Sequence, residues 1–102
     1  MKTLSKEIGR GGHDLNYKET LAIGKDKVRI KIRSDSTDFQ SYATVELFGN
    51  SKWNLIDYIH HSQMKTPHKL YYMVDKKDIE KAEASFKADR DKLIKLVKDV
   101  LE

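Results

Sequence analysis

The stretch Lys27–Arg33, which reads Lys-Val-Arg-Ile-Lys-Ile-Arg, decides how this chain folds. β-Branched apolar residues alternate in it with long cations, and successive side chains of a β-strand point to opposite faces. One face therefore carries Val28, Ile30 and Ile32, and the other carries Arg29, Lys31 and Arg33. The pattern predicts a strand that turns its apolar face to a core and its row of cations to solvent or to a partner.

The segment Ser41–Phe48 is predicted to return as the neighbouring antiparallel strand, after a turn at Asp35–Asp38 whose short polar side chains favour turns. Pairing Arg33 with Tyr42 gives three apolar pairs on one face, namely Ile32 with Ala43, Ile30 with Val45 and Val28 with Leu47. The same register sets Arg29 opposite Glu46 and Lys31 opposite Thr44 on the other face. Because a one-residue slip would turn every apolar side chain outward, this register is strongly specified.

The N-terminal part has a weaker pattern. Residues 1–16 are predicted to be a flexible arm, because Gly9-Arg10-Gly11-Gly12 ends a short apolar repeat and adds backbone freedom. Residues 17–102 are predicted to form a single α+β domain. Its first strand is indicated by Leu21 and Ile23, before a turn at Gly24–Asp26.

Beyond a turn at Gly49–Ser51, Lys52–His60 is predicted to be a further strand whose register stays open. A three-residue loop puts Trp53, Leu55 and Ile59 on the core face, whereas a one-residue slip puts Ile56 and Tyr58 there. In both cases large apolar side chains remain on the outer face, which is typical of a strand covered on both sides. The N-terminal arm and a second protein chain are the two candidates for that cover.

The C-terminal third predicts a short strand and a helix. Leu70–Val74 is expected to be a fifth strand, and apolar residues then recur on one helical stripe from Lys76 to about Leu101, with Asp75 as the cap. Asp89 interrupts the stripe, and the helix would be about 40 Å long. We therefore expect an α+β fold: a four- to five-stranded antiparallel meander sheet with one long C-terminal amphipathic helix packed on one face.

Composition excludes several classes of protein. The 102 residues include no cysteine, so disulfides, thiol nucleophiles and thiolate metal sites are impossible, and we expect a cytoplasmic protein. No apolar stretch fits a signal peptide or a membrane span. The net charge is +4, and residues 17–34 carry six cations against two acids. The excess of positive charge therefore lies on the first strands of the sheet.

No catalytic or cofactor motif is present. Gly9–Gly12 lacks the spacing and the lysine of a phosphate-binding loop, and the neighbouring His60 and His61 would point to opposite faces of a strand and chelate a metal poorly. Asp57 has no evident nucleophile partner, and an edge-facing charge that discourages strand aggregation explains it better. We expect no enzyme, no cofactor and no metal site; an enzyme that uses Asp57 with a histidine is a reserve hypothesis.

The leading expectation is a small non-enzymatic binding protein that acts through a protein–protein surface, with another protein or a second copy as partner. The apolar residues of Trp53–Ile59 and a helix longer than its sheet motivate it. Stoichiometric inhibitors of nucleic-acid-handling complexes, including phage anti-defence and anti-CRISPR proteins, are often chains of this kind. The alternative is a single-stranded RNA- or DNA-binding domain that uses a basic and aromatic sheet face. The residues expected to bind are Arg29, Lys31, Arg33, Tyr42, Phe48 and Trp53.

Overall fold

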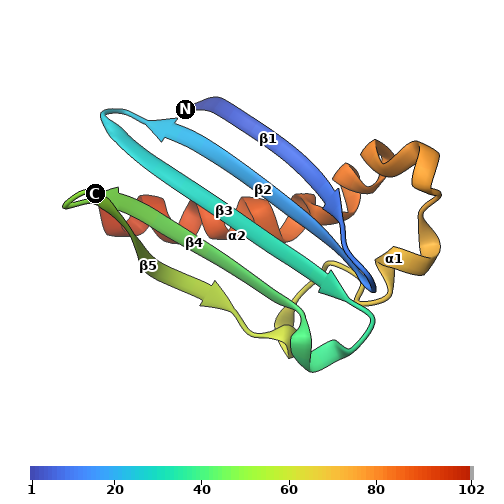
Figure 1. Cartoon of the computed structure of the whole chain (residues 1–102). Coiled ribbons are helices and arrows are strands. Elements are labelled where there is room, and N and C mark those ends of the chain that lie inside the picture. The colour runs from blue at the N-terminus through green and yellow to red at the C-terminus, as the bar shows by residue number, and fades with distance from the viewer. Residues whose placement is uncertain (102) are drawn as a thin grey trace.

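The alternating stretch Lys27–Arg33 lies at the centre of the sheet, within strand β3 (Asp26–Asp35). The computed structural model describes residues 1–101, and its strands follow one another in the order β1-β2-β3-β4-β5. The remaining strands are β1 (Lys2–Arg10), β2 (Asp14–Ile23), β4 (Tyr42–Gly49) and β5 (Lys52–Ile59). Helix α2 (Glu83–Leu101) lies across one face of this antiparallel meander, which confirms the predicted α+β architecture (Figure 1).

The predicted pairing of the two central strands is confirmed. Arg33 lies opposite Tyr42, and the three apolar pairs fall on the face that α2 covers. The core consists of that face together with one side of α2 and residues from the segment between β5 and α2. Its fully or almost fully buried members include Leu15, Leu21, Val28, Ile30, Ile32, Val45, Phe86, Leu93 and Val97.

Asp89, which interrupts the apolar stripe of α2, faces inward and holds the segment that follows β5. Its side chain is 1% exposed and accepts hydrogen bonds from the backbone N–H groups of Lys65 and Thr66 and from the Thr66 hydroxyl, at 2.6 to 3.1 Å. A buried carboxylate with this many donors is well satisfied. Asp89 therefore anchors the connection after β5 to helix α2.

Residues 1–16, expected to be a loosely held arm, instead form β1 and the start of β2. Lys2–Arg10 pairs with β2 along its length, with an irregularity at Leu4. Side-chain contacts add to the backbone ladder: Thr3 donates to Glu19, Lys6 pairs with Glu83, and Arg10 donates to two carbonyl oxygens near α1. The charged edge strand shows little apolar alternation because its side chains are mostly exposed, and backbone pairing requires no apolar pattern.

The β4–β5 hairpin explains why the register of the fourth predicted strand was ambiguous. Its turn contains two residues, Asn50 and Ser51, both with positive φ, instead of three. Phe48 faces Trp53 and Glu46 faces Leu55, but a β-bulge at Ile56 then shifts the pairing by one residue. Trp53 and Leu55 consequently lie on the face away from α2, while Ile59 lies on the buried face, so neither uniform register is correct.

Two predictions for the C-terminal third need correction. Leu70–Met73 forms a helical turn, α1, instead of a fifth strand, because the Tyr72 N–H bonds to the Lys69 carbonyl and the Leu70 side chain enters the core. The predicted helix starts with a 3-10 segment, Lys76–Ala82, that is non-helical at Asp78. The α-helix proper is therefore about 28 Å long, shorter than the length of about 40 Å expected from the sequence. No helix within residues 1–101 combines the length and the apolar character needed to cross a membrane.

Candidate binding face on the open side of the sheet

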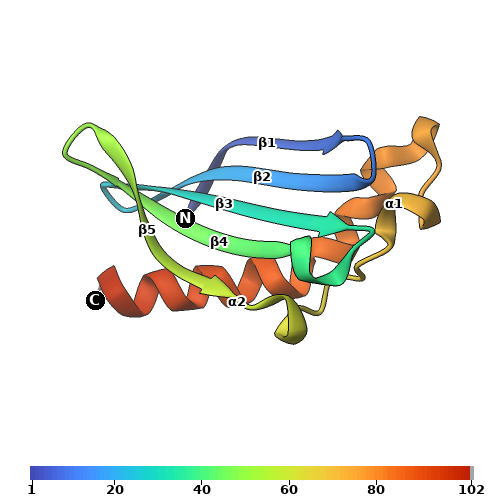
Figure 2. The same ribbon diagram turned by 60° about the horizontal axis from the view of Figure 1, so that its bottom comes forward.

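Helix α2 lies under one face of the sheet and leaves the other face open (Figure 2). We call this second surface the open face. The strand register arranges its side chains in rows that run across the sheet. One row contains Glu7, Lys18, Lys31, Thr44 and Tyr58, the next contains Ser5, Thr20, Arg29, Glu46 and Leu55, and a third contains Lys27, Phe48 and Trp53. All six residues predicted to bind a partner lie on the open face.

The central cations of this face are paired with acids of the protein itself. Arg29 forms a two-point ion pair with Glu46, at 2.8 Å from Nε and 3.1 Å from Nη2. Lys31 lies 3.5 Å from the same carboxylate. The hydrogen bond from Arg29 and the charge of Lys31 hold the pKa of Glu46 below its usual value. Glu46 therefore neutralises part of the positive charge that the sequence places on β3.

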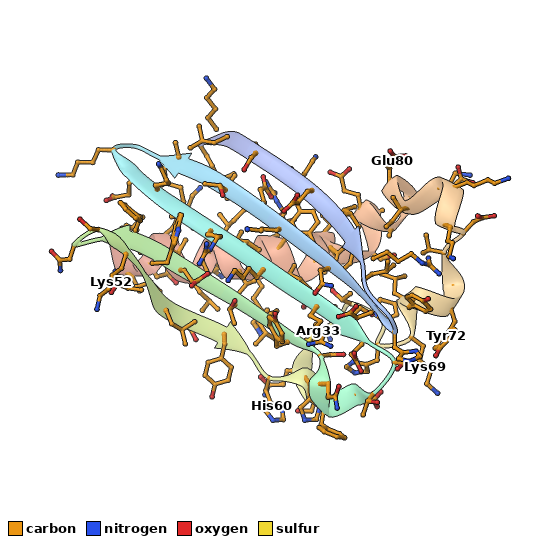
Figure 3. The ribbon with its side chains drawn as sticks, in the orientation of Figure 1. Arg33, Lys52, His60, Lys69, Tyr72 and Glu80 are labelled. Carbon is orange, nitrogen blue, oxygen red and sulfur yellow. The ribbon has the colours of Figure 1, made fainter. Side chains whose placement is uncertain are left out.

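Arg33 is held in the same way at the far end of the strand. Its Nε lies 2.8 Å from Asp14, and its Nη2 donates to Asp35 at 3.1 Å. Figure 3 shows Arg33 at one end of the sheet and Lys52, in the β4–β5 hairpin, at the other. The predicted row of cations thus spans much of β3, but Arg29, Lys31 and Arg33 all have anionic neighbours.

Aromatic side chains dominate the half of the open face formed by β4 and β5. The Arg29 guanidinium lies 4.4 Å from the centre of the Trp53 ring, and Phe48 meets Trp53 edge-on at 5.3 Å. Four large side chains of this half remain substantially exposed: Tyr42 (40%), Phe48 (43%), Leu55 (62%) and Tyr58 (60%). We call these four residues and Trp53 the aromatic edge.

The sequence predicted part of this site and missed part of it. Trp53 contacts both Arg29 and Phe48, whereas Tyr42 lies beside Arg33 at the other end of the strands. Leu55 and Tyr58 were not both assigned to the open face, because each of the two uniform registers puts one of them on the core face; the two-residue turn places Leu55 on the open face, and the bulge at Ile56 places Tyr58 there too. Lys18 was also missed, since the predicted first strand began only at Leu21; the extended pattern of Leu15, Tyr17 and Glu19 was the available signal.

A buried ionic cluster lies on the opposite side of the sheet, next to α2. Glu19 is 1% exposed and accepts hydrogen bonds from Arg90, at 2.7 and 3.1 Å, from the Tyr17 hydroxyl at 2.6 Å and from the Thr3 hydroxyl at 2.7 Å. Burial, together with the hydrogen bond to Glu19, raises the pKa of Tyr17. A cavity of about 560 Å³ opens beside this cluster. Both carboxylate oxygens of Glu19 already accept hydrogen bonds within the protein. We therefore interpret this cluster as a structural contact that holds helix α2 on the sheet.

The other candidate groups have structural partners too. Asp57 accepts a hydrogen bond from its neighbour's N–H, Tyr58 N, at 2.8 Å, and His60 Nδ1 accepts one from Ser62 N at 3.2 Å. In the Gly9–Gly12 segment, Gly9 and Arg10 end β1, and Gly11 and Gly12 begin the β1–β2 connection, in which Gly11 N bonds to the Asp14 carbonyl. Within residues 1–101, no three His, Asp or Glu side chains are grouped closely enough to hold a metal ion.

The open face is therefore the best candidate for a binding surface, since it combines exposed aromatic rings with cations whose charge is only partly neutralised. No protein-family model, curated protein or solved structure matches this chain, so its function has to be inferred from that face.

Proposed function

We propose that this protein is a non-enzymatic binding protein and that its open face binds another protein. The observation that carries the proposal is the contrast between the two halves of the face: Arg29, Lys31 and Arg33 of β3 are engaged by acids of the protein, while four of the five residues of the aromatic edge are exposed. Contiguous exposed apolar side chains on a small domain mark interaction sites. Tyr, Trp and Arg are also the residue types that contribute most to protein–protein binding energy.

The face is a better docking surface than the edge of β5. β5 is the last strand of the sheet, so one of its sides has no neighbouring strand. Its bulge at Ile56 interrupts a regular ladder, and the Asp57 carboxylate occupies the N–H of Tyr58. Bulges and charges on an edge discourage the addition of a further strand. A partner is therefore expected to lie on the side chains of β4 and β5 and not to extend the sheet.

A more specific form of this proposal is a stoichiometric inhibitor of a nucleic-acid-handling complex, of the phage anti-defence or anti-CRISPR type. The basic strand β3 beside an aromatic edge supports it, because positive charge steers association with an acidic surface. A composition without cysteine supports a cytoplasmic location.

Single-stranded nucleic-acid binding is the second candidate. It is supported by the presence of Lys18 and Lys27 on the same face as Tyr42, Phe48 and Trp53, because cations and aromatic rings together bind phosphates and stack bases. The pairing of Arg29 with Glu46 counts against it, since that acid repels a phosphate backbone at the centre of the face.

Site-specific photo-crosslinking tests the proposal. A photoreactive phenylalanine analogue replaces Leu55 on the open face or, as a control, Val100, which is 58% exposed on α2. Irradiation in extract of the native host should give a protein adduct from position 55 and none from position 100. The purified partner should then form a complex of fixed stoichiometry that Leu55→Asp weakens and Val100→Asp does not.

Two results would contradict protein binding through this face. One is equal crosslinking from both positions. The other is an adduct with nucleic acid from position 55, together with oligonucleotide affinity that falls steeply between about 50 and 200 mM salt. The second result would establish the nucleic-acid candidate instead, while a 1:1 adduct with the protein itself would identify a second copy as the partner.

A further inference from the structure

The open face contains one place where two cations lie directly opposite each other. Lys18 of β2 pairs in register with Lys31 of β3, and both side chains point to the open face. Like charges in directly opposite positions of an antiparallel pair repel each other and destabilise the sheet. Such an arrangement favours the approach of an anion.

The acids of the protein do not neutralise this pair. Glu46 is the acid bonded to Lys31, and it is shared with Arg29, which binds it at two points. Among the ion pairs formed by residues 1–101, none involves Lys18. Glu7 lies opposite Lys18 on the β1 side but is not ion-paired with it. Lys18 is therefore an exposed cation without an ion-pair partner among the described residues, and it is available to bind an external anion.

The surface beside Lys18 is hollowed into a groove of about 340 Å³. Its lining includes Ser5, Glu7, Lys18, Thr20, Arg29 and Trp53. The groove thus combines one unpaired ammonium group, two hydroxyl groups and an indole ring. An oxyanion can accept hydrogen bonds from the ammonium and hydroxyl groups, while the indole packs against a short apolar stem.

We infer that this groove is the anchor for an acidic side chain of the partner protein, with the Asp or Glu carboxylate beside Lys18 and its methylene groups against Trp53. The inference rests on the proposed protein-binding function and specifies the chemistry of the partner: an acidic residue flanked by apolar residues, which contact the aromatic edge.

A single carboxylate fits the face better than a nucleic-acid strand. Acids are spread over the open face, with Glu7 on β1, Glu46 on β4, and Asp14 and Asp35 around Arg33. A continuous phosphate backbone that crosses the sheet would pass close to several of them. One carboxylate in the groove meets Glu7 alone, at the β1 side.

The test is an NMR titration of the full chain with a blocked tripeptide, acetyl-Leu-Glu-Leu-amide, and with its Gln counterpart at equal ionic strength. The glutamate peptide should give saturable shifts of the Lys18 and Thr20 amide signals and of the Trp53 indole N–H. Lys18→Gln should weaken its binding about threefold, as expected for the loss of one exposed ion pair. Glu7→Gln should strengthen binding, because it removes the acid of the groove.

Lys27→Gln is the matched control, since it removes the same charge from the same face outside the groove, and it should leave the affinity unchanged. The inference is overturned by equal binding of the two peptides, by equal losses in the Lys18 and Lys27 variants, or by a short oligothymidylate that saturates the same signals at lower concentration. Lys18 is exposed, so its variant is expected to fold, and its amide spectrum checks this directly.

The two proposals can fail separately. Crosslinking from position 55 to a partner whose affinity is unchanged by Lys18→Gln would leave the open face as the interface and overturn the anchor. Specific glutamate-peptide binding without crosslinking from position 55 would support the anchor and contradict the wider protein-binding face.

Discussion

Arg90 of α2 and Glu19 of β2, 71 residues apart in the chain, form a two-point ion pair that joins the helix to the sheet at 2.7 and 3.1 Å. The Glu19 side chain is buried, whereas the Arg90 side chain is 23% exposed. The pair is thus one of the few points at which charge, and not apolar packing, fixes how α2 lies on the sheet.

Loss of Arg90 should be far more costly than loss of an exposed lysine on the same helix. Arg90→Met leaves the Glu19 carboxylate buried without its main partner and should lower the free energy of unfolding by about 3 kcal/mol. Lys87→Met, which breaks an exposed pair with Asp91, should cost less than about 0.5 kcal/mol. Urea denaturation measures both, and the interpretation fails if the two variants are equally stable.

Acid should destabilise the protein through these same carboxylates. Burial raises the pKa of Glu19, but hydrogen bonds from Arg90, Tyr17 and Thr3 lower it further, to below the ordinary value of 4.5. The pKa of Glu46 is likewise held below 4.5, chiefly by the hydrogen bond from Arg29. Because the unfolded chain takes up these protons first as the pH falls, stability is fully present above about pH 5 and is lost progressively below it.

The measurement is the free energy of unfolding between about pH 7 and pH 3. Glu46→Gln should be less stable than the wild type near neutral pH and should lose less stability on acidification. Glu80→Gln is the control, since Glu80 is exposed and its variant should follow the wild-type curve. Parallel curves for the wild type and Glu46→Gln would contradict a stabilising role of the Glu46 carboxylate.

Gly11, in the β1–β2 connection, should tolerate a side chain less well than its neighbour Gly12. A Cβ at Gly11 would lie 1.9 Å from Asp14 Oδ1, so Gly11→Ala must displace the carboxylate that pairs with Arg33. A Cβ at Gly12 would meet no atom within 4 Å. Gly11→Ala should therefore cost about 1 kcal/mol, the contribution of the displaced ion pair, and Gly12→Ala should be nearly neutral. Equal melting temperatures of the two variants would contradict this close contact.

The central part of the fold was predictable because residues of opposite character alternate there. In β3 and β4 one face is buried, so the register that pairs Ile30 with Val45 is the one that places the aliphatic side chains of both strands on that face. β1 was not predicted because this edge strand is held mainly by backbone hydrogen bonds to β2. Such bonds do not depend on side-chain type, so they leave no pattern in the sequence. α1 escaped because tertiary burial of Leu70 outweighs the strand preference of the tyrosines beside it.

The candidate site was predictable to the same extent. Alternation placed Arg29, Lys31 and Arg33 on one face, and the register set Glu46 opposite Arg29. The acids that hold Arg33 lie at the ends of β2 and β3, outside the predicted strands. The position of Leu55 on the open face depends on a two-residue turn, and that of Tyr58 on the bulge at Ile56, which has no residue signature here.

Asp57 should protect the edge of the sheet from self-association. It is the acidic residue of β5, and its carboxylate accepts a hydrogen bond from Tyr58 N in a strand with no neighbour on one side. Asp57→Val removes both the charge and the acceptor, and it lengthens an apolar edge strand. We expect a larger share of dimers and higher oligomers than in the wild type, as measured by size-exclusion chromatography with light scattering.

Two further variants separate the causes of that effect. Asp57→Asn keeps an acceptor for Tyr58 N without the charge and should give an intermediate share of oligomers. Asp99→Val makes the same change on the exposed side of α2, away from any strand edge, and should match the wild type. If Asp99→Val associates as strongly as Asp57→Val, added surface hydrophobicity alone explains the result. Edge protection by Asp57 would then be wrong, and the case for docking on the open face would lose the argument that the β5 edge is closed.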